Sequence, residues 1–320
     1  MYATYLRNEG HDVIWGEDTI KAFFPGVQAD WLKNDKVIEN DFQIDIPFEQ
    51  LPFPDRTFTD AKNKRWQSYG NYKYHPATHM MASNLCWWGK CTFCVDTLKL
   101  QQGENRGLRT VEHVMAEIDD LIRLGFKEVF DDSGTFPISD WLHEFCDKMI
   151  KSGRNKKIVL GCNMKPISNK VVPFKMMKDA GFRFMLVGVE SANQATIDKI
   201  HKGQESSKVI ENIKSMSDAG LQVHTTWMLK YPFETEDDFK RTITEAHFLL
   251  RKGYSHTAQC SIYMPPRTAP EESQENRNAI NKFYSIYKDP RYWVRKVMDI
   301  RRIEDITYLL KRIGHVKHAE

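Results

Sequence analysis

Apolar and polar positions alternate in a regular way from about residue 77 to about residue 270. Short apolar runs, which are typical of buried strands, predict strands at residues 78–82, 126–130, 157–162, 182–189, 221–229 and 257–264. Apolar residues at helical spacing predict helices at residues 111–122, 141–150, 171–179, 206–219 and 235–250. Strands and helices that alternate in this way predict right-handed βαβ units around a parallel sheet.

Capping residues agree with several of these helix boundaries. Thr110 precedes one helix as an N-cap residue, and Thr235 with Asp238 has the spacing of a capping box. Gly181 and Gly220 follow two other helices, where a glycine commonly ends a helix. Local chemistry and periodicity therefore predict the same elements.

The chain on either side of this regular part has a different pattern. Residues 1–76 contain prolines and polar aromatic stretches without a clear period, and we expect a short irregular N-terminal segment there. Apolar and basic side chains at helical spacing predict C-terminal helices at 276–287 and 293–311 that cap the sheet. The sequence thus divides into an N-terminal segment, a core at 77–270 and a helical extension at 271–320.

Composition places the chain among ordinary globular proteins. Hydrophobic residues make up 41% and charged residues 28% of the sequence, and no apolar run is long enough to span a membrane. The net charge is +3, with 46 basic and 43 acidic residues interspersed, so we expect no nucleic-acid partner. Six cysteines without a secretory signal pattern indicate a reducing compartment, which predicts a cytoplasmic protein.

Three of the six cysteines, Cys86, Cys91 and Cys94, lie within nine positions. Clustered thiolates bind iron–sulfur clusters or zinc, and three of them leave one position open for a cofactor or substrate. We therefore predict an active metal centre. The alternative is structural zinc with His79 or His75 as fourth ligand, although His79 falls on a predicted strand. The other three cysteines stand alone and are expected to be small buried residues: Cys146, Cys162 and Cys260.

Polar residues follow the predicted strands at the point where each strand ends. Residues 131–135 follow the second strand, 188–191 end the fourth, and 230–235 follow the fifth. The carboxyl ends of parallel strands meet at one edge of the sheet, where ligands bind in α/β proteins. We therefore expect these residues and the cysteine loop to form one site.

These residues resemble the radical S-adenosylmethionine (radical SAM) superfamily over about residues 77–270. The ending Cys-Thr-Phe-Cys at 91–94 matches the family's pattern, with four rather than the usual three residues between Cys86 and Cys91. Gly-Val-Glu-Ser at 188–191 and Pro-Phe-Glu-Thr at 232–235 are similar to the family's strand-end motifs. The resemblance implies an α/β fold with a partial (β/α)6 TIM-like barrel.

The resemblance also implies cofactors and the residues that bind them. Cys86, Cys91 and Cys94 would bind a [4Fe–4S] cluster, and S-adenosylmethionine would chelate its fourth iron. Contacts to S-adenosylmethionine are expected from the cysteine loop and from the ends of the second and fourth strands: Phe93, Asp131, Asp132, Ser133, Glu190 and Ser191. No residue is assigned a catalytic role.

The same motifs look most like superfamily members that carry an N-terminal cobalamin-binding domain. Residues 5–13 resemble one helix and one strand of such a domain, so residues 1–76 are either a degenerate remnant or the end of a domain that begins upstream. The sequence has no Asp-x-His-x-x-Gly motif for a cobalamin ligand. Cobalamin is therefore allowed by the resemblance but not favoured.

The reaction implied by the resemblance is reductive cleavage of S-adenosylmethionine to a 5′-deoxyadenosyl radical, which abstracts hydrogen from a small-molecule or peptide substrate. Electrons would come from a donor such as flavodoxin or ferredoxin. The sequence does not identify the substrate, and methyl transfer and other radical modifications both fit. The second hypothesis is a non-catalytic binding protein on a decayed radical SAM fold, because Lys230 and Phe233 replace usual glycines. The third is a zinc-stabilised α/β protein.

Overall fold

The computed structural model describes residues 47–56, 72–104, 106–265, 273–300 and 305–306. The chain divides into two compact units, Met1–Pro52 and Phe53–Glu320. The described residues of the first unit form one short 3₁₀ helix, η1 (Phe48–Gln50), and the elements predicted within residues 1–46 lie outside the described residues. The second unit contains the sheet.

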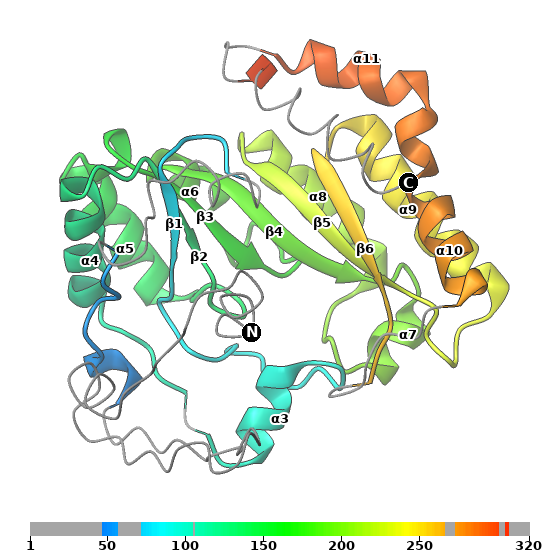
Figure 1. Cartoon of the computed structure of the whole chain (residues 1–320), viewed down its shortest axis with the longest axis horizontal. Coiled ribbons are helices and arrows are strands. Elements are labelled where there is room, and N and C mark those ends of the chain that lie inside the picture. The colour runs from blue at the N-terminus through cyan, green and yellow to red at the C-terminus, as the bar shows by residue number, and fades with distance from the viewer. Residues whose placement is uncertain (1–46, 57–71, 105, 266–272, 301–304, 307–320) are drawn as a thin grey trace, which may run out of the picture. The chain divides into compact units, whose positions relative to one another are not determined.

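Six parallel strands form this sheet, and they follow one another in the sheet in the order of the sequence (Figure 1). Their bounds are β1 (Ala77–Met80), β2 (Glu128–Asp131), β3 (Val159–Met164), β4 (Phe182–Glu190), β5 (Gln222–Leu229) and β6 (Thr257–Ile262). Among the described strands, β1 and β6 each pair with a single neighbour, so the sheet is open. The predicted α/β fold with a partial (β/α)6 TIM-like barrel is confirmed.

Helices connect the strands close to the predicted positions. They are α4 (Val111–Arg123), α5 (Asp140–Lys151), α6 (Phe174–Asp179), α8 (Val209–Asp218) and α9 (Glu236–Lys252). Thr110 caps α4 through its side chain, and Thr235 with Asp238 forms the predicted capping box at α9. Helix α6 begins three residues after its predicted start at residue 171, because Pro173 is its N-cap residue.

Within the core, two helices and one 3₁₀ turn were not predicted: α3 (Val95–Gln101), α7 (Gln194–Lys199) and η3 (Arg154–Lys156). The helix predicted at 206–219 begins with a 3₁₀ turn, η4 (Ser206–Lys208), that continues into α8. Helices of seven and six residues contain fewer than two turns, which is too short for a helical period to be recognised.

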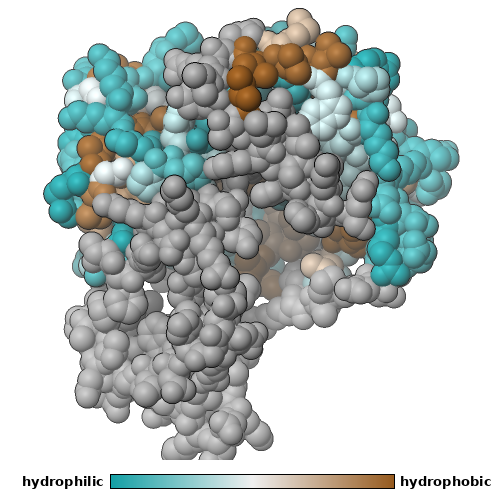
Figure 2. Space-filling model, turned by 45° about the horizontal axis from the view of Figure 1, so that its top comes forward, coloured by the Kyte–Doolittle hydropathy of each residue, from teal (hydrophilic) through white to brown (hydrophobic). Residues whose placement is uncertain are grey.

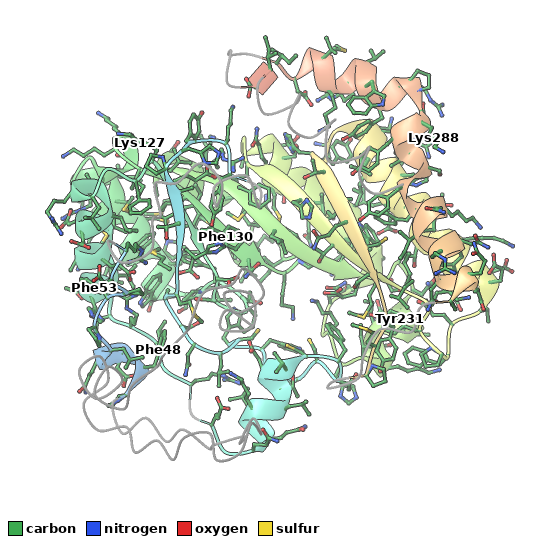
Figure 3. The ribbon with its side chains drawn as sticks, in the orientation of Figure 1. Phe48, Phe53, Lys127, Phe130, Tyr231 and Lys288 are labelled. Atoms are coloured by element: carbon green, nitrogen blue, oxygen red, sulfur yellow. The ribbon has the colours of Figure 1, made fainter. Side chains whose placement is uncertain are left out.

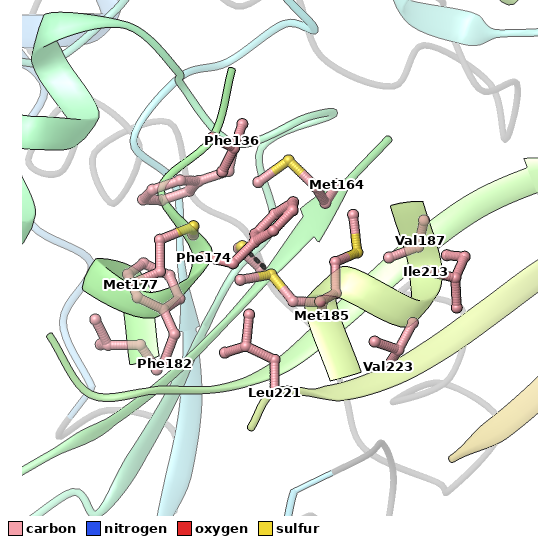
Figure 4. Packing of buried hydrophobic residues seen from close by; sticks show 14 of the residues in the cluster. Phe136, Met164, Phe174, Met177, Phe182, Met185, Val187, Ile213, Leu221 and Val223 are labelled. Atoms are coloured by element: carbon pink, nitrogen blue, oxygen red, sulfur yellow. Dashed lines mark hydrogen bonds between the residues drawn. The ribbon is translucent and has the colours of Figure 1, made fainter. Parts of the chain in front are cut away.

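The main hydrophobic core lies between the sheet and the helices that cover it. Met185 and Val187 on β4 and Val223 on β5 pack there with Met177 of α6 and Ile213 of α8 (Figure 4). Cys146 and Cys162 are fully buried, as predicted, whereas Cys260 on β6 is half-buried. Burial of the sheet face that packs against the helices fixes the register of the strands, because a slip by one residue would turn these side chains to the other face.

The other face of the sheet is closed near the amino ends of the strands. Phe130, which lies in the middle of the sheet in Figure 3, packs against Phe184, whose ring contacts His224. Arg183 donates from Nε to Glu128 at 3.0 Å, and both side chains are buried. The amino-end half of this face is thus filled with side chains.

The C-terminal extension is helical, as predicted, over its described part. It contains α10 (Gln274–Tyr284), η5 (Ser285–Lys288) and α11 (Pro290–Met298); α10 contacts β6 and α11 contacts α9. α11 exposes Val294, Val297 and Met298; hydrophobic atoms are visible at the upper margin of the surface in Figure 2. Within the described residues, no helix is long and apolar enough to cross a membrane.

A buried charge triad holds the segment that leaves β1. Glu117 on α4 accepts from Arg56 at 2.5 Å and from Arg109, and all three side chains are buried. Arg109 also donates to the carbonyl of Met81 at 3.0 Å, and its backbone N–H donates to Ala82 at 3.0 Å. The triad therefore fixes the chain just before the cysteine loop.

Substitution Glu117→Gln should destabilise the protein strongly, because it removes the counter-charge that two buried guanidinium groups share among the described residues. We expect the free energy of unfolding to fall by about 3–5 kcal/mol, measured by urea denaturation. Glu112→Gln, which removes an exposed ion pair with Lys148, should leave the midpoint nearly unchanged. Equal, small effects of both substitutions would contradict a structural role for the triad.

Candidate active site

The cysteine loop connects β1 to α3 and lies at the carboxyl end of the sheet. Cys91 is buried, while Cys86 and Cys94 are half-buried. The backbone N–H of Cys94 donates to the carbonyl of Cys91 at 3.1 Å, and Cys94 is the N-cap residue of α3. The turn and the unpredicted helix therefore fix two of the three thiols relative to each other.

The first cysteine is held by α3 and by the segment that follows β2. The backbone N–H of Cys86 donates to Asp96 at 2.9 Å, and its Sγ lies 3.3 Å from Thr135 Oγ1. Gly134 provides the room for this approach, because a Cβ there would lie 2.8 Å from Cβ of Cys86. The predicted convergence of the second strand's end with the cysteine loop is therefore present.

Asp131 and Ser133 hold the chain between β1 and the cysteine loop. Asp131 accepts the backbone N–H of Ala82 at 2.8 Å, and Ser133 Oγ accepts that of Ser83 at 2.9 Å. Both side chains are fully buried, and burial raises the pKa of Asp131 to about 7. Asp132 is the exposed member of the three. Contact of these residues with S-adenosylmethionine stays a prediction. Of the three side chains, that of Asp132 is the accessible one.

A clamp of three residues, Trp88, Lys165 and Gly203, anchors the cysteine loop on the turn after α7. The indole Nε1 of Trp88 donates to the carbonyl of His201 at 2.8 Å. The ammonium of Lys165 lies 3.7 Å from the centroid of the Trp88 ring and donates to the carbonyl of Lys202 at 2.8 Å. Gly203 has φ +62, and a Cβ there would lie 2.0 Å from Trp88 Cζ2. Trp88 is one of the four residues between Cys86 and Cys91. The segment that is one residue longer than usual in the family therefore contains the residue that anchors the loop.

Glu190, at the end of β4, forms a buried ion pair with Lys202 at 2.7 Å. Gly188 makes room for the pair, because a Cβ there would lie 2.5 Å from Glu190 Oε1 and 2.8 Å from Lys202 Nζ. Glu190 has φ +67, a conformation that is unfavourable for a residue with a Cβ. The Gly-Val-Glu motif thus builds an ion pair at the sheet edge, and contact of Glu190 with S-adenosylmethionine stays a prediction.

Ser191 belongs to a hydrogen-bond network that joins β4, α7 and the turn after β5. Ser191 Oγ and Thr196 Oγ1 each donate to Glu234 at 2.7 Å. Asn193 Nδ2 joins the network by donating to the carbonyl of Asp238 at 2.9 Å. Ser191 is fully buried and positions these elements, and its contact with the cofactor stays a prediction.

Phe93 lies in a small apolar cluster at the same edge of the sheet. It packs against Ile197, Ile200 and Tyr231, and Figure 3 places Tyr231 beside α7. The ammonium of Lys202 lies 5.8 Å from the centroid of the Phe93 ring. The ring is half-buried, and its predicted contact with an adenine stays a prediction.

The charges around the thiols suit an anionic metal–thiolate group. Burial raises the pKa of Cys91 to about 11 and also raises that of Cys94, and each is raised further by the charge of a neighbouring cysteine. Lys202 and Lys165 act in the opposite direction on Cys91. Burial, followed by repulsion from Lys202, lowers the pKa of Lys165 to about 8. Two ammonium groups thus lie near Cys86 and Cys91, whose ionisation a bound metal would drive.

The donor set fits an iron–sulfur cluster better than a zinc ion. Among the described residues, no three His, Cys, Asp or Glu side chains are grouped so that they could hold a single metal ion. A four-iron cluster distributes three thiolates over three metals, whereas zinc needs its ligands around one point. His79 instead packs against the rings of Tyr72 and Phe130. His79, one of the two residues considered as a fourth zinc ligand, thus lies among aromatic rings.

The sequence did not single out several residues of this edge. The structure places Lys165 in the clamp, where it is 6% exposed. Lys202, Gly203 and Asp96 were missed. Their contacts depend on α3 and α7, which the sequence pattern did not predict. The glycine at 203 was the one signal in the sequence for a turn here.

Substitution Gly203→Ala should displace Trp88 from the clamp. A left-handed alanine costs roughly 1–2 kcal/mol by itself. Gly220→Ala carries the same backbone cost, with φ +86, but its Cβ meets only the side chain of Lys178 at 3.5 Å. We expect both variants to lose stability and only Gly203→Ala to retain less iron after anaerobic reconstitution and gel filtration. Equal iron content in the two variants would show that the clamp does not position the loop.

The stability of the metal-free protein should depend on the ionisation of Asp131. Its pKa in the fold, about 7, lies above its ordinary value, so the folded state binds the extra proton and loses stability as the pH rises through roughly 4–7. Relative to Asp131→Asn, the wild-type free energy of unfolding should fall by up to about 1.4 kcal/mol per pH unit between pH 5 and 7. Asp132→Asn is the matched control and should keep the wild-type slope. Parallel curves for wild type and Asp131→Asn would mean that Asp131 stays ionised.

Curated relatives match the core of the chain at low identity. The chain is 25% identical over 163 residues to a protein of Methanocaldococcus jannaschii named provisionally as a methylthiotransferase; the match covers 48% of this chain. It is 26% identical over 166 residues, 51% of this chain, to an uncharacterised methyltransferase of Pyrococcus horikoshii. Each match spans 35% of the relative's own length.

Solved structures of enzymes are similar to this chain at still lower identity. The methyltransferase TsrM from Kitasatospora setae, with cobalamin and a [4Fe–4S] cluster bound, has a TM-score of 0.49 at 14% identity, covering 61% of this chain and 41% of that chain. Methylornithine synthase PylB also has a TM-score of 0.49 at 14% identity, covering 72% of this chain and 67% of that chain.

The family assignment rests on the sequence profile of the radical SAM superfamily. The profile matches residues 80–246, just over half of the chain, and this match includes the three clustered cysteines and the ends of β2, β4 and β5. The chain belongs to the radical SAM superfamily of enzymes.

Proposed function

We propose that this enzyme binds a [4Fe–4S] cluster through Cys86, Cys91 and Cys94, binds S-adenosylmethionine at the open iron, and cleaves it reductively. The observation that carries the proposal is the position of these thiols. They lie on one anchored loop at the carboxyl edge of the sheet, and two buried ammonium groups face Cys91. Three thiolates leave one metal position open, which is where a chelating cofactor fits.

When bound, the cluster and S-adenosylmethionine supply a 5′-deoxyadenosyl radical that abstracts hydrogen from the substrate. The protein's own residues orient the cofactors and compensate their charge. Lys165 and Lys202 place positive charge beside the thiolates, which stabilises the more reduced, more negative state of a metal–thiolate centre. Phe93 and Tyr231 give the same edge an apolar wall that suits a nucleobase.

Methyl transfer is the reaction class that the chain favours. The name of one relative refers to methyl transfer, and the name of the other refers to methylthio transfer, which moves a sulfur atom together with the methyl group. Sulfur insertion of the kind that needs a second cluster has less support, since Cys146 and Cys162 are fully buried and separate from the loop. We propose a small molecule or a peptide as the substrate and an electron donor of the flavodoxin or ferredoxin class, and cobalamin is not favoured.

The hypothesis of a decayed binding protein has less support in the geometry. Lys230 replaces a usual glycine, but it adopts the left-handed conformation itself, with φ +64. Phe233 stacks on Tyr231 at 5.4 Å between ring centroids, outside the network around Glu234. Both substitutions thus leave the turn after β5 formed.

Anaerobic reconstitution tests the proposal. The protein is loaded with iron and sulfide, reduced with dithionite and mixed with S-adenosylmethionine, and 5′-deoxyadenosine is measured by mass spectrometry. We expect product from the wild type and from Cys260→Ala, whose thiol lies on β6 away from the loop. Cys91→Ala should give no more product than a protein-free control, because the cluster loses one of its three ligands. A Cys91→Ala variant that keeps its cluster and its activity would falsify the ligand assignment.

A further inference from the structure

Helix α11 exposes apolar side chains where a surface helix usually exposes polar ones. Val294, Val297 and Met298 lie at positions i, i+3 and i+4, so they form one stripe on the helix, and each is between 59% and 61% exposed. The neighbouring helix α10 has the usual pattern, since it buries Ala279 and Phe283 and its exposed residues are all polar. The apolar stripe is therefore a specific property of α11.

The opposite side of α11 is attached to the rest of the second unit. Tyr292 is buried in the main hydrophobic core, and Lys296 donates to the backbone carbonyl of His256, directly before β6. Arg295 lies against Gly253, the C-cap residue of α9. Figure 1 shows α11 at the margin of the unit, and it contacts α9. These contacts fix the rotation of the helix, so the stripe faces away from the core.

Basic side chains near the stripe reach further into solvent than the acidic side chains with which they pair. The side chain of Arg291 is 72% exposed, and that of Asp289, its partner at 2.7 Å, is 17% exposed. The side chain of Arg295 is 42% exposed, and that of Asp299, its partner at 3.4 Å, is 27% exposed. Lys288, which is labelled in Figure 3, is exposed on η5 just before the helix. The surface around the stripe is therefore positively charged.

The sequence after α11 continues this charge pattern. Residues 288–317 contain nine basic and four acidic residues, whereas the whole chain has 46 and 43. A basic segment with exposed apolar side chains at helical spacing is typical of helices that lie on a membrane surface. Trp293 is half-buried and lies four residues before Val297, at the border of the stripe, and tryptophan is enriched where membrane and water meet. Charge and apolar pattern thus point to the same kind of partner.

We propose that α11 attaches this protein to a membrane surface rich in anionic phospholipids. The stripe enters the boundary between headgroups and acyl chains, and Lys288, Arg291 and Arg295 lie beside the phosphate groups. An apolar stripe of three side chains binds weakly by itself, so attachment needs the basic side chains as its second contribution. The attachment is therefore peripheral, reversible and dependent on the charge of the lipid.

This attachment leaves the candidate active site facing away from the bilayer. The contact of Lys296 with His256 places α11 beside the amino end of β6, whereas the cysteine loop lies at the carboxyl end of the sheet. The six residues of β6 separate the two ends by about 20 Å. In Figure 1, α11 lies above the sheet and α3 lies below it. The site thus stays open to the aqueous side, and the proposal is independent of the proposed function.

Sedimentation of the full chain with lipid vesicles tests the proposal. One set of vesicles consists of phosphatidylcholine, and the other of phosphatidylcholine and phosphatidylglycerol in equal parts. We expect the wild type to sediment with the anionic vesicles and not with the neutral ones, and added salt should weaken the binding. Equal sedimentation with both sets, or sedimentation with neither, would overturn the assignment to an anionic surface.

Substitutions separate the apolar contribution from the electrostatic one. Val294→Ser combined with Val297→Ser should lower the partition coefficient onto anionic vesicles about tenfold, and Arg291→Gln should lower it about fivefold. Val171→Ser and Lys175→Gln, at exposed positions before and in α6, are the matched controls and should bind like the wild type. Thermal midpoints establish that each variant is folded. Wild-type binding by folded α11 variants would overturn the proposal.

Analytical ultracentrifugation without vesicles tests a different occupant of the stripe, a second copy of this chain. The wild type and the variant with serine at both valine positions should have the same sedimentation coefficient, because the stripe binds lipid rather than protein. A wild-type dimer that the two serine substitutions convert into a monomer would assign the stripe to a contact between two copies and would overturn the proposal.

Discussion

The position of the cysteine loop depends above all on the indole of Trp88, packed on Gly203 under the ammonium of Lys165. The loop lies outside the sheet, so side-chain contacts must fix it in three dimensions. The clamp ties it to the turn after α7, the buried pair of Glu190 and Lys202 holds that turn at the end of β4, and Gly188 makes the pair possible. The geometry of the predicted metal site therefore depends on glycines and lysines as much as on cysteines.

Charge explains why two lysines are buried at this edge. An isolated buried ammonium is unfavourable, yet Lys202 is compensated by Glu190, and Lys165 by backbone carbonyls and an aromatic face. Both act on Cys91, and the summed positive charge favours ionised thiolates. An anionic metal–thiolate group would compensate the positive charge of Lys165 and Lys202 that Glu190 does not compensate.

The repetitive part of the fold could be predicted from the sequence. Strand and helix periods placed all six strands within a few residues, and Thr110 and the capping box at Thr235 set helix starts correctly. The cysteine spacing identified the loop without structural information. Burial of Asp131 and Ser133 could not be foreseen, because a strand-end acid has the same sequence signature whether it faces a cofactor or supports the chain beside it. The clamp was also beyond prediction, since it joins residues far apart in sequence through two helices too short to show a period.

The most direct test of the central claim is the electron paramagnetic resonance spectrum of the reduced, anaerobically reconstituted enzyme, recorded with its iron content. We expect about four irons per chain and a reduced cluster whose spectrum changes when S-adenosylmethionine is added, because the cofactor binds the iron that no cysteine holds. A chain that retains zinc and no iron, or a cluster whose spectrum is unaffected by S-adenosylmethionine, would contradict the account.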